Sequence, residues 1–429
     1  MPLSFSLLKK MFKFLHTADI HLDSPLKGLE SYEDAPVEEI REASRRAFDN
    51  LIDFAMDEEV DFILIAGDLY DGPWKDYNTG LFFVNRMGRL KNAGIRVFIV
   101  AGNHDAASHT TKALSLPDNV TLFSSKKAET KLLDELQVAI HGQSYPAGAV
   151  SENLATLYPP RHPGYFNIGL LHTALTGRAG HEPYAPCSLD DLRSRGYDYW
   201  ALGHVHQQEV VARDPWIIFP GNLQGRHIRE TGAKGATLVT VAEGRVTAME
   251  PREFDVLRWV QCRVDLSTCE TMDAVFEQVR QGIETHRLTR DGRPLAMRLI
   301  LVGACPVHAD LIGRWTRLIE EFRGVAAASG EVWLEKVLLQ TRRRSDLAEL
   351  VGRDTALAGM LHSLDELQLG TEELVALVPD LPAFKSRLPH ELFEGEEPFL
   401  ADSPEQINAL RDEVRELLVA RLLQHGGQG

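Results

Sequence analysis

The chain has 429 residues, of which 44% are hydrophobic and 25% are charged, and its formal net charge is −16 at pH 7. The length predicts two or three domains, and the composition is typical of a globular protein. The negative charge argues against broad nonspecific attraction to nucleic acid, although metal ions, local basic clusters or a partner could still hold such a polymer. No run approaches the roughly 20 apolar residues of a membrane-spanning helix. We therefore expect a cytoplasmic protein.

Residues 1–10 lack the apolar length and the cleavage site of a signal peptide, and we interpret them as a dispensable extension or an upstream start. The four cysteines show no C-x-x-C spacing; they are Cys187, Cys262, Cys269 and Cys305. In a long chain of this kind, free thiols are favoured over disulfides or zinc ligands.

Strands and helices alternate through the first part of the chain. Apolar runs and helical spacing predict strand 13–18, helix 36–59, strand 60–66, helix 79–92 and strand 96–100. Further strands are predicted at 166–171, 197–202, 216–219 and 236–241. Strands that are apolar enough to be covered on both faces indicate an α/β layered domain, which we place at 13–255.

Residues 257–340 predict a small α+β domain, with strand 260–264, helix 271–285, strand 296–302, helix 309–322 and strand 332–338. Residues 345–429 look helical and acidic, and prolines break them into pieces. The last of these helices, from about Pro404 to Gln424, carries an apolar stripe. This stripe fits docking to a partner and packing on its own domain equally well.

Five short polar motifs lie where predicted strands end. They are Asp19-Ile20-His21, Gly67-Asp68-Leu69-Tyr70-Asp71, Gly102-Asn103-His104-Asp105, His172, and Gly203-His204-Val205-His206. Ligands gather at the carboxyl ends of strands in open α/β sheets, so we expect these motifs to meet. Together they supply four candidate ligand histidines, one asparagine and two carboxylates.

These residue types suit a centre of two metal ions about 3.5–4 Å apart, which can hold a bridging hydroxide as nucleophile against a phosphate ester. Asp68 is the natural bridge, because a carboxylate has enough lone pairs for two ions. Mixed nitrogen and oxygen ligands favour Mn²⁺, Fe²⁺ or Zn²⁺ over magnesium. His104 is left to donate a proton or to stabilise the transition state, and Asp105 could fix its tautomer.

Each motif alone would usually be structural, and the ordered set is far more specific than any member. His16 is expected to be a packed histidine rather than a ligand. Asp71 could line the pocket or cap the following loop, and Arg226-His227 could reach a phosphate or form a surface turn. Other basic residues near the motifs are expected mostly at the solvated surface; they are Lys27, Lys75, Arg86, Arg178, Arg229 and Lys234.

The segments Leu15–Leu22 and Ala66–Asp71 resemble the calcineurin-like metallophosphoesterase superfamily, and within it the SbcD-type nuclease subunits of double-strand-break repair complexes. The segments Tyr184–Cys187 and Phe219–His227 resemble its YhaO-like branch. The resemblance is strong over about 13–255 and weak beyond. It implies a four-layer αββα core, two Mn²⁺ ions, and exonuclease and endonuclease cleavage of DNA phosphodiesters.

By this resemblance, Asp19, His21, Asp68 and His206 would hold one ion. Asp68, Asn103, His172 and His204 would hold the other, and His104 would be the catalytic histidine. Residues 257–340 would be a capping domain that helps to position DNA, and residues 345–429 would dock an SMC-like ATPase subunit of the SbcC/YhaN type. A homodimer is implied by the resemblance alone. The chain has no G-x-x-x-x-G-K-[ST] sequence, so any ATP-driven step must come from elsewhere.

Two rival functions are considered. A phosphodiesterase of cyclic or small nucleotides could use the same core, although such a substrate needs no extension like residues 257–429. A noncatalytic scaffold could keep the metal site for structure alone, but the complete ligand set and His104 argue against it.

Overall fold

The computed structural model describes residues 11–24, 42–71, 78–106, 115–175, 184–289 and 291–344. The expectations for residues 1–10 and 345–429, including the C-terminal apolar stripe, lie outside these ranges.

The described residues divide into two compact units. The first takes in residues up to 264 together with 275–301 and 315–340, and the second takes in 265–274, 302–314 and the residues from 341 onward. The domain limits expected from the sequence stay predictions.

Two six-stranded sheets form the body of the first unit, in the orders β12-β11-β1-β2-β3-β4 and β5-β6-β7-β8-β10-β9. The first contains β1 (Phe12–Thr17), β2 (Phe62–Ala66), β3 (Arg96–Val100), β4 (Val120–Leu122), β11 (Gly235–Ala242) and β12 (Arg245–Glu253). The second contains β5 (Glu129–Leu133), β6 (Val138–Gly142), β7 (Phe166–His172), β8 (Tyr199–Gly203), β9 (Glu209–Arg213) and β10 (Trp216–Phe219). Strands β1 to β4 pair in parallel, as do β6, β7, β8 and β10, so their carboxyl ends share one edge of each sheet.

Alternating side chains along the strands create the layers. On β2, Phe62 and Leu64 point into the core between the two sheets, whereas Ile63 and Ile65 pack with the helices α2 (Ala43–Asp57) and α3 (Asn78–Asn92). Because the two faces of this strand are both apolar, it reads as a continuous hydrophobic run in the sequence. The sequence prediction of a strand here, covered on both faces, is confirmed.

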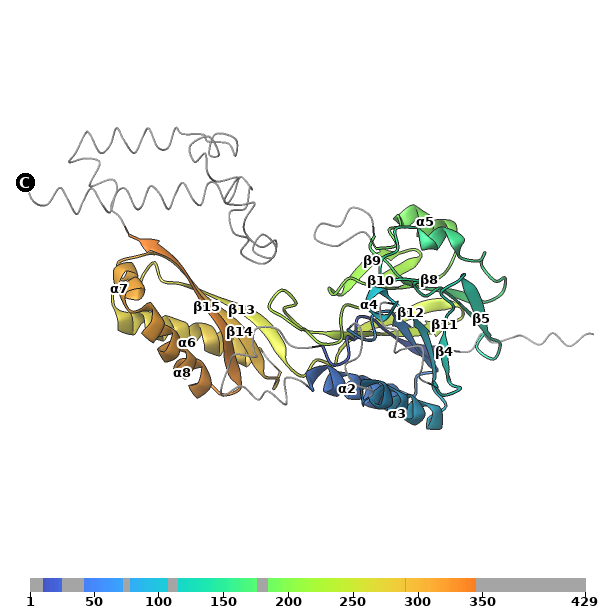
Figure 1. Ribbon diagram of the computed structural model, residues 1–429, viewed down its shortest axis with the longest axis horizontal. Coiled ribbons are helices and arrows are strands. Elements are labelled where there is room, and N and C mark those ends of the chain that lie inside the picture. Colours follow the sequence, from blue (N-terminus) through green and yellow to red (C-terminus); the bar gives the residue numbers. More distant parts are fainter. Residues whose placement is uncertain are drawn as a thin grey trace, which may run out of the picture. The chain divides into compact units, whose positions relative to one another are not determined.

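The second sheet repeats this arrangement. Tyr199 and Ala201 of β8 face the core between the sheets, and Trp200 and Leu202 face outward. The outward face is covered by the 3₁₀ helix η2 (Leu154–Leu157) and by α5 (Leu189–Ser194). The core therefore has four layers, helix–sheet–sheet–helix, as the resemblance implied (Figure 1).

The strands β13 (Arg258–Asp265), β14 (Leu295–Cys305) and β15 (Val332–Arg343) form a three-stranded sheet in that order. Three helices accompany it: α6 (Met272–Leu288), α7 (His308–Gly313) and α8 (Trp315–Ala328). The prediction of one helix over 309–322 is wrong, because α7 ends at Gly313 and α8 begins at Trp315. Glycine disfavours the helix, and Arg314 between the two has φ −123°.

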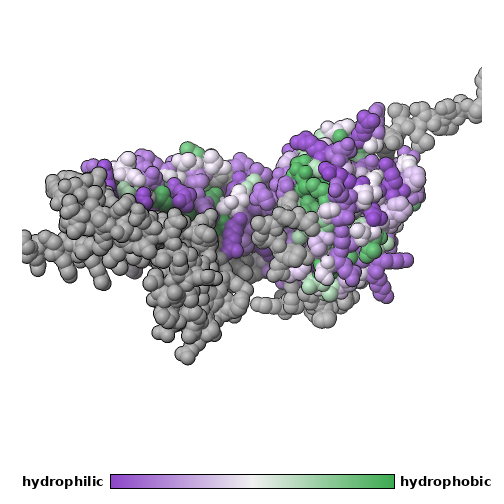
Figure 2. Space-filling view, turned by 90° about the horizontal axis from the view of Figure 1, so that it is seen from above, coloured by the Kyte–Doolittle hydropathy of each residue, from purple (hydrophilic) through white to green (hydrophobic). Residues whose placement is uncertain are grey.

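All four cysteines are free, as the sequence analysis predicted, and all four are buried. Among the described helices, none has the length and apolar character needed to cross a membrane. In the view of Figure 2, hydrophilic residues dominate the described surface, and hydrophobic ones form small separate patches.

A substitution at Gly203, the last residue of β8, would test how closely this strand approaches β2 of the other sheet. A Cβ atom there would lie 1.9 Å from the carbonyl oxygen of Ala66 at the end of β2. We therefore expect Gly203→Ala to lower the free energy of unfolding by about 1–3 kcal/mol, measured by urea denaturation. Gly88→Ala in α3 is the control: its Cβ would meet nothing within 4 Å, and it should gain up to about 1 kcal/mol. Equal stability of Gly203→Ala and the wild type would refute this packing.

Candidate metal centre

Five strands of the two sheets end beside one another and carry the predicted ligands. Asp19 and His21 follow β1, Asp68 follows β2, Asn103 begins the short helix α4 (Asn103–Ala106) after β3, and His172 is the last residue of β7. His204 and His206 follow β8. Ligand atoms of Asp19, His21 and His206 lie within 4.8 Å of one another, and so do those of Asp19, Asp68 and His172. The structure thus brings together carboxylates and imidazoles that are far apart in the sequence.

Asp19 and Asp68 are buried carboxylates at the middle of this cluster. The backbone N–H of His204 donates to Asp19 Oδ2 at 2.9 Å, and that of His104 donates to Asp68 Oδ1 at 3.0 Å. Burial raises the pKa of both acids, to about 6 for Asp68, and the nearby Asp68 adds to the rise at Asp19. Two adjacent buried acids are unfavourable in their charged forms, so the pair favours a site for cations.

Two of the histidines are held with one ring nitrogen turned toward the acids. His172 Nδ1 lies 2.8 Å from the Ala66 carbonyl oxygen, to which it donates, and its Nε2 lies 3.5 Å from Asp68 Oδ2. His206 Nδ1 lies 2.6 Å from Glu230 Oε1, and its Nε2 lies 3.7 Å from Asp19 Oδ1. A carbonyl or carboxylate on one ring nitrogen fixes the tautomer that leaves the other nitrogen ready to bind a metal.

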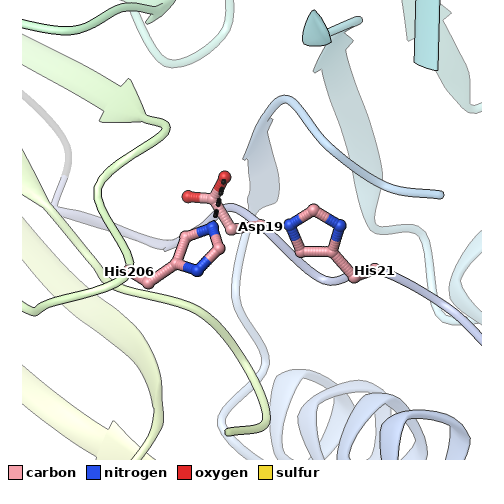
Figure 3. Close-up of side chains that lie close together, drawn as sticks. All are labelled: Asp19, His21 and His206. Atoms are coloured by element: carbon pink, nitrogen blue, oxygen red, sulfur yellow. Dashed lines mark ion pairs between the residues drawn. The ribbon is translucent and has the colours of Figure 1, made fainter. Parts of the chain in front are cut away.

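His21 shows most directly that the residues fit a metal. It is buried, and neither ring nitrogen has good hydrogen-bond geometry to any described residue; its Nδ1 has only a long contact, 3.5 Å, with Asp71 Oδ1. Its Nε2 lies 3.9 Å from Asp68 Oδ2, and in Figure 3 its ring and that of His206 lie beside Asp19; the centroids of the two rings are 5.2 Å apart. Burial lowers the pKa of His21 well below its usual range, so the ring is neutral. A buried neutral imidazole without good hydrogen bonds is costly, and a metal–nitrogen bond would satisfy it.

The backbone of the ligand segments is strained. Four of the predicted ligands have left-handed φ angles although none is glycine: Asp19 at 49°, His21 at 46°, Asp68 at 52° and His204 at 102°. Such conformations cost about 1–3 kcal/mol each and cluster at functional sites. They aim side chains in directions that a regular strand end could not provide.

The catalytic candidate His104 has a partner other than the predicted one. Its ring is 40% exposed, and Nδ1 lies 3.1 Å from Asp71 Oδ1, which raises the pKa of His104. The predicted partner Asp105 is buried and accepts from three backbone N–H groups, those of Leu69, Tyr70 and Gly102, at 2.9–3.2 Å. The hypothesis that Asp105 orients the His104 ring is therefore corrected. Asp71 contacts the ring, and Asp105 links the segment that contains Leu69 and Tyr70 to the segment that begins at Gly102.

Glu230 was missed in the sequence analysis. It is buried, and besides His206 it contacts the side-chain amide of Asn222 and the backbone N–H of Arg226. Burial favours its neutral form, but the hydrogen bond from His206 and the charge of Arg226 outweigh this and hold the pKa of Glu230 below its usual range. Nothing in the sequence marks Glu230, which lies three residues past the last motif noted there.

His16 is a packed histidine, as predicted. Its Nδ1 lies 3.0 Å from the Tyr199 hydroxyl and its Nε2 lies 3.1 Å from the Leu202 carbonyl oxygen. Among the basic candidates, Arg86 pairs with Asp49 at 2.7 Å. Lys27, Lys75 and Arg178 lie outside the described residues.

A cavity of about 530 Å³ opens beside the cluster. Its lining includes Asp68, Asn103, His104, Tyr184, His204, His206, Gln207, Arg226, His227, Arg229, Glu230 and Lys234. The lining combines acids, imidazoles and basic groups, which suits a polar, charged ligand rather than an apolar one.

Comparison with known proteins agrees with this geometry. Residues 12–208 match the calcineurin-like phosphoesterase family, and residues 259–342 match the middle domain of metallophosphoesterase YhaO. The chain is 40% identical over 297 residues to the uncharacterized metallophosphoesterase YhaO of Bacillus subtilis (strain 168), covering 68% of this chain and 72% of that protein.

The chain is also 27% identical to two proteins named DNA double-strand break repair protein Mre11. That of Sulfurisphaera tokodaii aligns over 68% of this chain and 73% of its own, and that of Methanopyrus kandleri over 70% and 67%. With its buried cluster of metal-binding residues and its four-layer core, the chain belongs to the calcineurin-like metallophosphoesterases, in a YhaO-like branch.

Proposed function

We propose that this chain is a two-metal phosphodiesterase that hydrolyses DNA, as an exonuclease or endonuclease of DNA repair. One observation carries the proposal: buried carboxylates, imidazoles and an amide from separate strand ends meet beside a polar cavity that also holds His104. The similarity to two proteins named for double-strand break repair supports DNA as the substrate.

By the resemblance to the family, the ligands would divide between two ions. Asp19, His21 and His206 would complete one site, and Asn103, His172 and His204 the other, with Asp68 shared. Mixed nitrogen and oxygen donors favour Mn²⁺, with Fe²⁺ and Zn²⁺ as alternatives. When bound, such ions polarise the phosphoryl group and activate water.

His104 would act as the acid. Asp71 accepts from Nδ1 and raises the pKa of the ring, which favours its protonated form and leaves Nε2–H for the leaving oxygen. The 40% exposure of the ring and its place in the cavity lining let it reach a substrate. Asp105 acts indirectly, because its bonds to the backbone of Leu69, Tyr70 and Gly102 hold the two motifs that carry Asp71 and His104.

A phosphodiesterase of small nucleotides is the second candidate. The observation in its favour is the cavity itself, because about 530 Å³ falls within the usual range for a single small ligand. An SMC-like ATPase partner, a homodimer and a cytoplasmic location stay predictions from the sequence.

Metal binding should raise the free energy of unfolding of the protein. We expect Mn²⁺ at about 100 times its dissociation constant to raise the free energy of unfolding of the wild type by about 2.7 kcal/mol. Asp68→Asn should lose this gain, yet without metal at pH 7 it should be more stable than the wild type by roughly 1–3 kcal/mol, because it removes a buried charge. Asp118→Asn, at an exposed aspartate, should behave as the wild type does. A full response to Mn²⁺ in Asp68→Asn would contradict the ligand assignment.

Cleavage of DNA should depend on both metal and His104. End-labelled duplex and single-stranded DNA incubated with Mn²⁺, Mg²⁺ or EDTA should be cut by the wild type with Mn²⁺. His104→Ala should be slower by roughly 10²–10⁴-fold. His162→Ala, outside the cavity lining, is the control.

The other outcomes separate the candidates. Intact DNA together with hydrolysis of bis(p-nitrophenyl) phosphate would favour the small-nucleotide enzyme. Hydrolysis of neither substrate, with Mn²⁺ bound, would favour a scaffold.

The pH dependence of kcat should show the effect of Asp71 on the pKa of His104. Asp71 raises the pKa of His104, so the ring keeps its proton, and the enzyme its acid, to a higher pH than an ordinary histidine would. In Asp71→Asn the fall of kcat on the alkaline side should therefore begin at a lower pH, as measured with the best substrate found above. An unchanged alkaline limb would mean that His104 is not the acid.

A further inference from the structure

Arg226 is a basic residue of the cavity whose guanidinium makes only long contacts with the nearby carboxylates. It is 16% exposed and lies in the loop that follows β10. Its guanidinium lies 3.7 Å from Asp71 Oδ1, through Nη1, and 3.4 Å from Glu230 Oε1, through Nη2. Nε is buried and has no hydrogen-bond partner within the described part of the chain.

Two other arginines of this chain, one partly buried and one buried, show how a guanidinium with close carboxylate contacts is held. Arg86 makes two bonds to Asp49, at 2.7 and 2.9 Å, and Arg298 makes two to Glu335, at 2.9 and 2.8 Å. These are the paired, parallel bonds for which the guanidinium fork is suited. The contacts of Arg226 with carboxylates are all longer, so its five N–H donors are poorly used.

The loop does not need this guanidinium for its shape. The backbone N–H of Arg226 already donates to Glu230 Oε2 at 2.7 Å, and Asn222 donates to the same oxygen at 2.8 Å. His206 bonds the other oxygen of Glu230. Glu230 is therefore held in place by three groups that do not involve the arginine side chain.

We propose that Arg226 binds the phosphoryl group of the substrate, donating two N–H bonds to its non-bridging oxygens. The side chain lines the same cavity as Asp68, Asn103 and His104. The carboxylates of Asp71 and Glu230 lie near its two terminal nitrogens and position the guanidinium. A phosphate ester offers paired anionic oxygens, whereas the carboxylates give this guanidinium one long hydrogen bond, 3.4 Å to Glu230 Oε1, and one contact of 3.7 Å with Asp71 Oδ1. This inference rests on the proposed phosphodiesterase function, and it names the residue that recognises the phosphate.

Inorganic phosphate is the probe. Its dissociation constant should be measured by calorimetry with Mn²⁺ present, beside the dissociation constant of Mn²⁺ and the kcat and KM for bis(p-nitrophenyl) phosphate. We expect Arg226→Gln to weaken phosphate binding at least tenfold and to leave Mn²⁺ binding unchanged. Arg226→Lys, which keeps the charge and loses the fork, should recover part of the loss. Arg86→Gln removes the same charge from a partly buried ion pair outside the cavity and should bind phosphate as the wild type does.

Two results would overturn the inference. Phosphate binding by Arg226→Gln equal to that of the wild type would show that the side chain does not touch the anion. A parallel loss of Mn²⁺ affinity would show that Arg226 only supports Glu230 and His206. A wild type that binds phosphate through Arg226 but hydrolyses no ester would support the inference while refuting the proposed function.

Discussion

The rest of the site depends on burying two carboxylates, Asp19 and Asp68, next to each other. Each is anchored by a backbone N–H from a different motif: His204 serves Asp19, and His104 serves Asp68. These bonds lower the cost of the charged forms but do not cancel it, since the pKa of both acids still lies above its usual value. The remaining cost favours a cation beside the two acids. Placing the acids side by side, each with its backbone N–H donor, requires that several strands end at one place.

Glycines in the motifs make this convergence possible. At Gly67, with φ 95°, a Cβ atom would lie 2.3 Å from His172 Nδ1, and at Gly102 it would lie 2.3 Å from Asp68 Oδ1. In both cases the added atom would collide with a predicted ligand. The two glycines thus serve the close approach of neighbouring motifs as well as the turn of their own backbone.

The sequence predicted what is local and missed what depends on contacts between distant segments. Apolar runs that end in polar residues predicted most of the core strands and the seven candidate ligands, because strand and motif are adjacent in the chain. The buried core strand β6 was missed, since its apolar run is short and no noted motif follows it. The half-exposed strands β4, β5 and β9 gave no such run, since one face carries polar residues. Glu230 sits 24 residues from His206, in an irregular loop whose path no periodicity describes.

The misassigned partner of His104 has a simple geometric cause. His104 and Asp105 are neighbours in the short helix α4, where successive side chains point about 100° apart. Asp105 is therefore directed at the backbone of neighbouring motifs, and Asp71 is free to approach the ring.

The same arrangement explains why the contacts of Arg226 with carboxylates are long. Asp71 Oδ1 lies closer to His104 than to Arg226, at 3.1 against 3.7 Å, and Glu230 Oε1 lies closer to His206, at 2.6 against 3.4 Å. In each pair the histidine occupies the carboxylate oxygen at the shorter distance, so two acids fix two rings and together leave one guanidinium charged, confined and available to an anion.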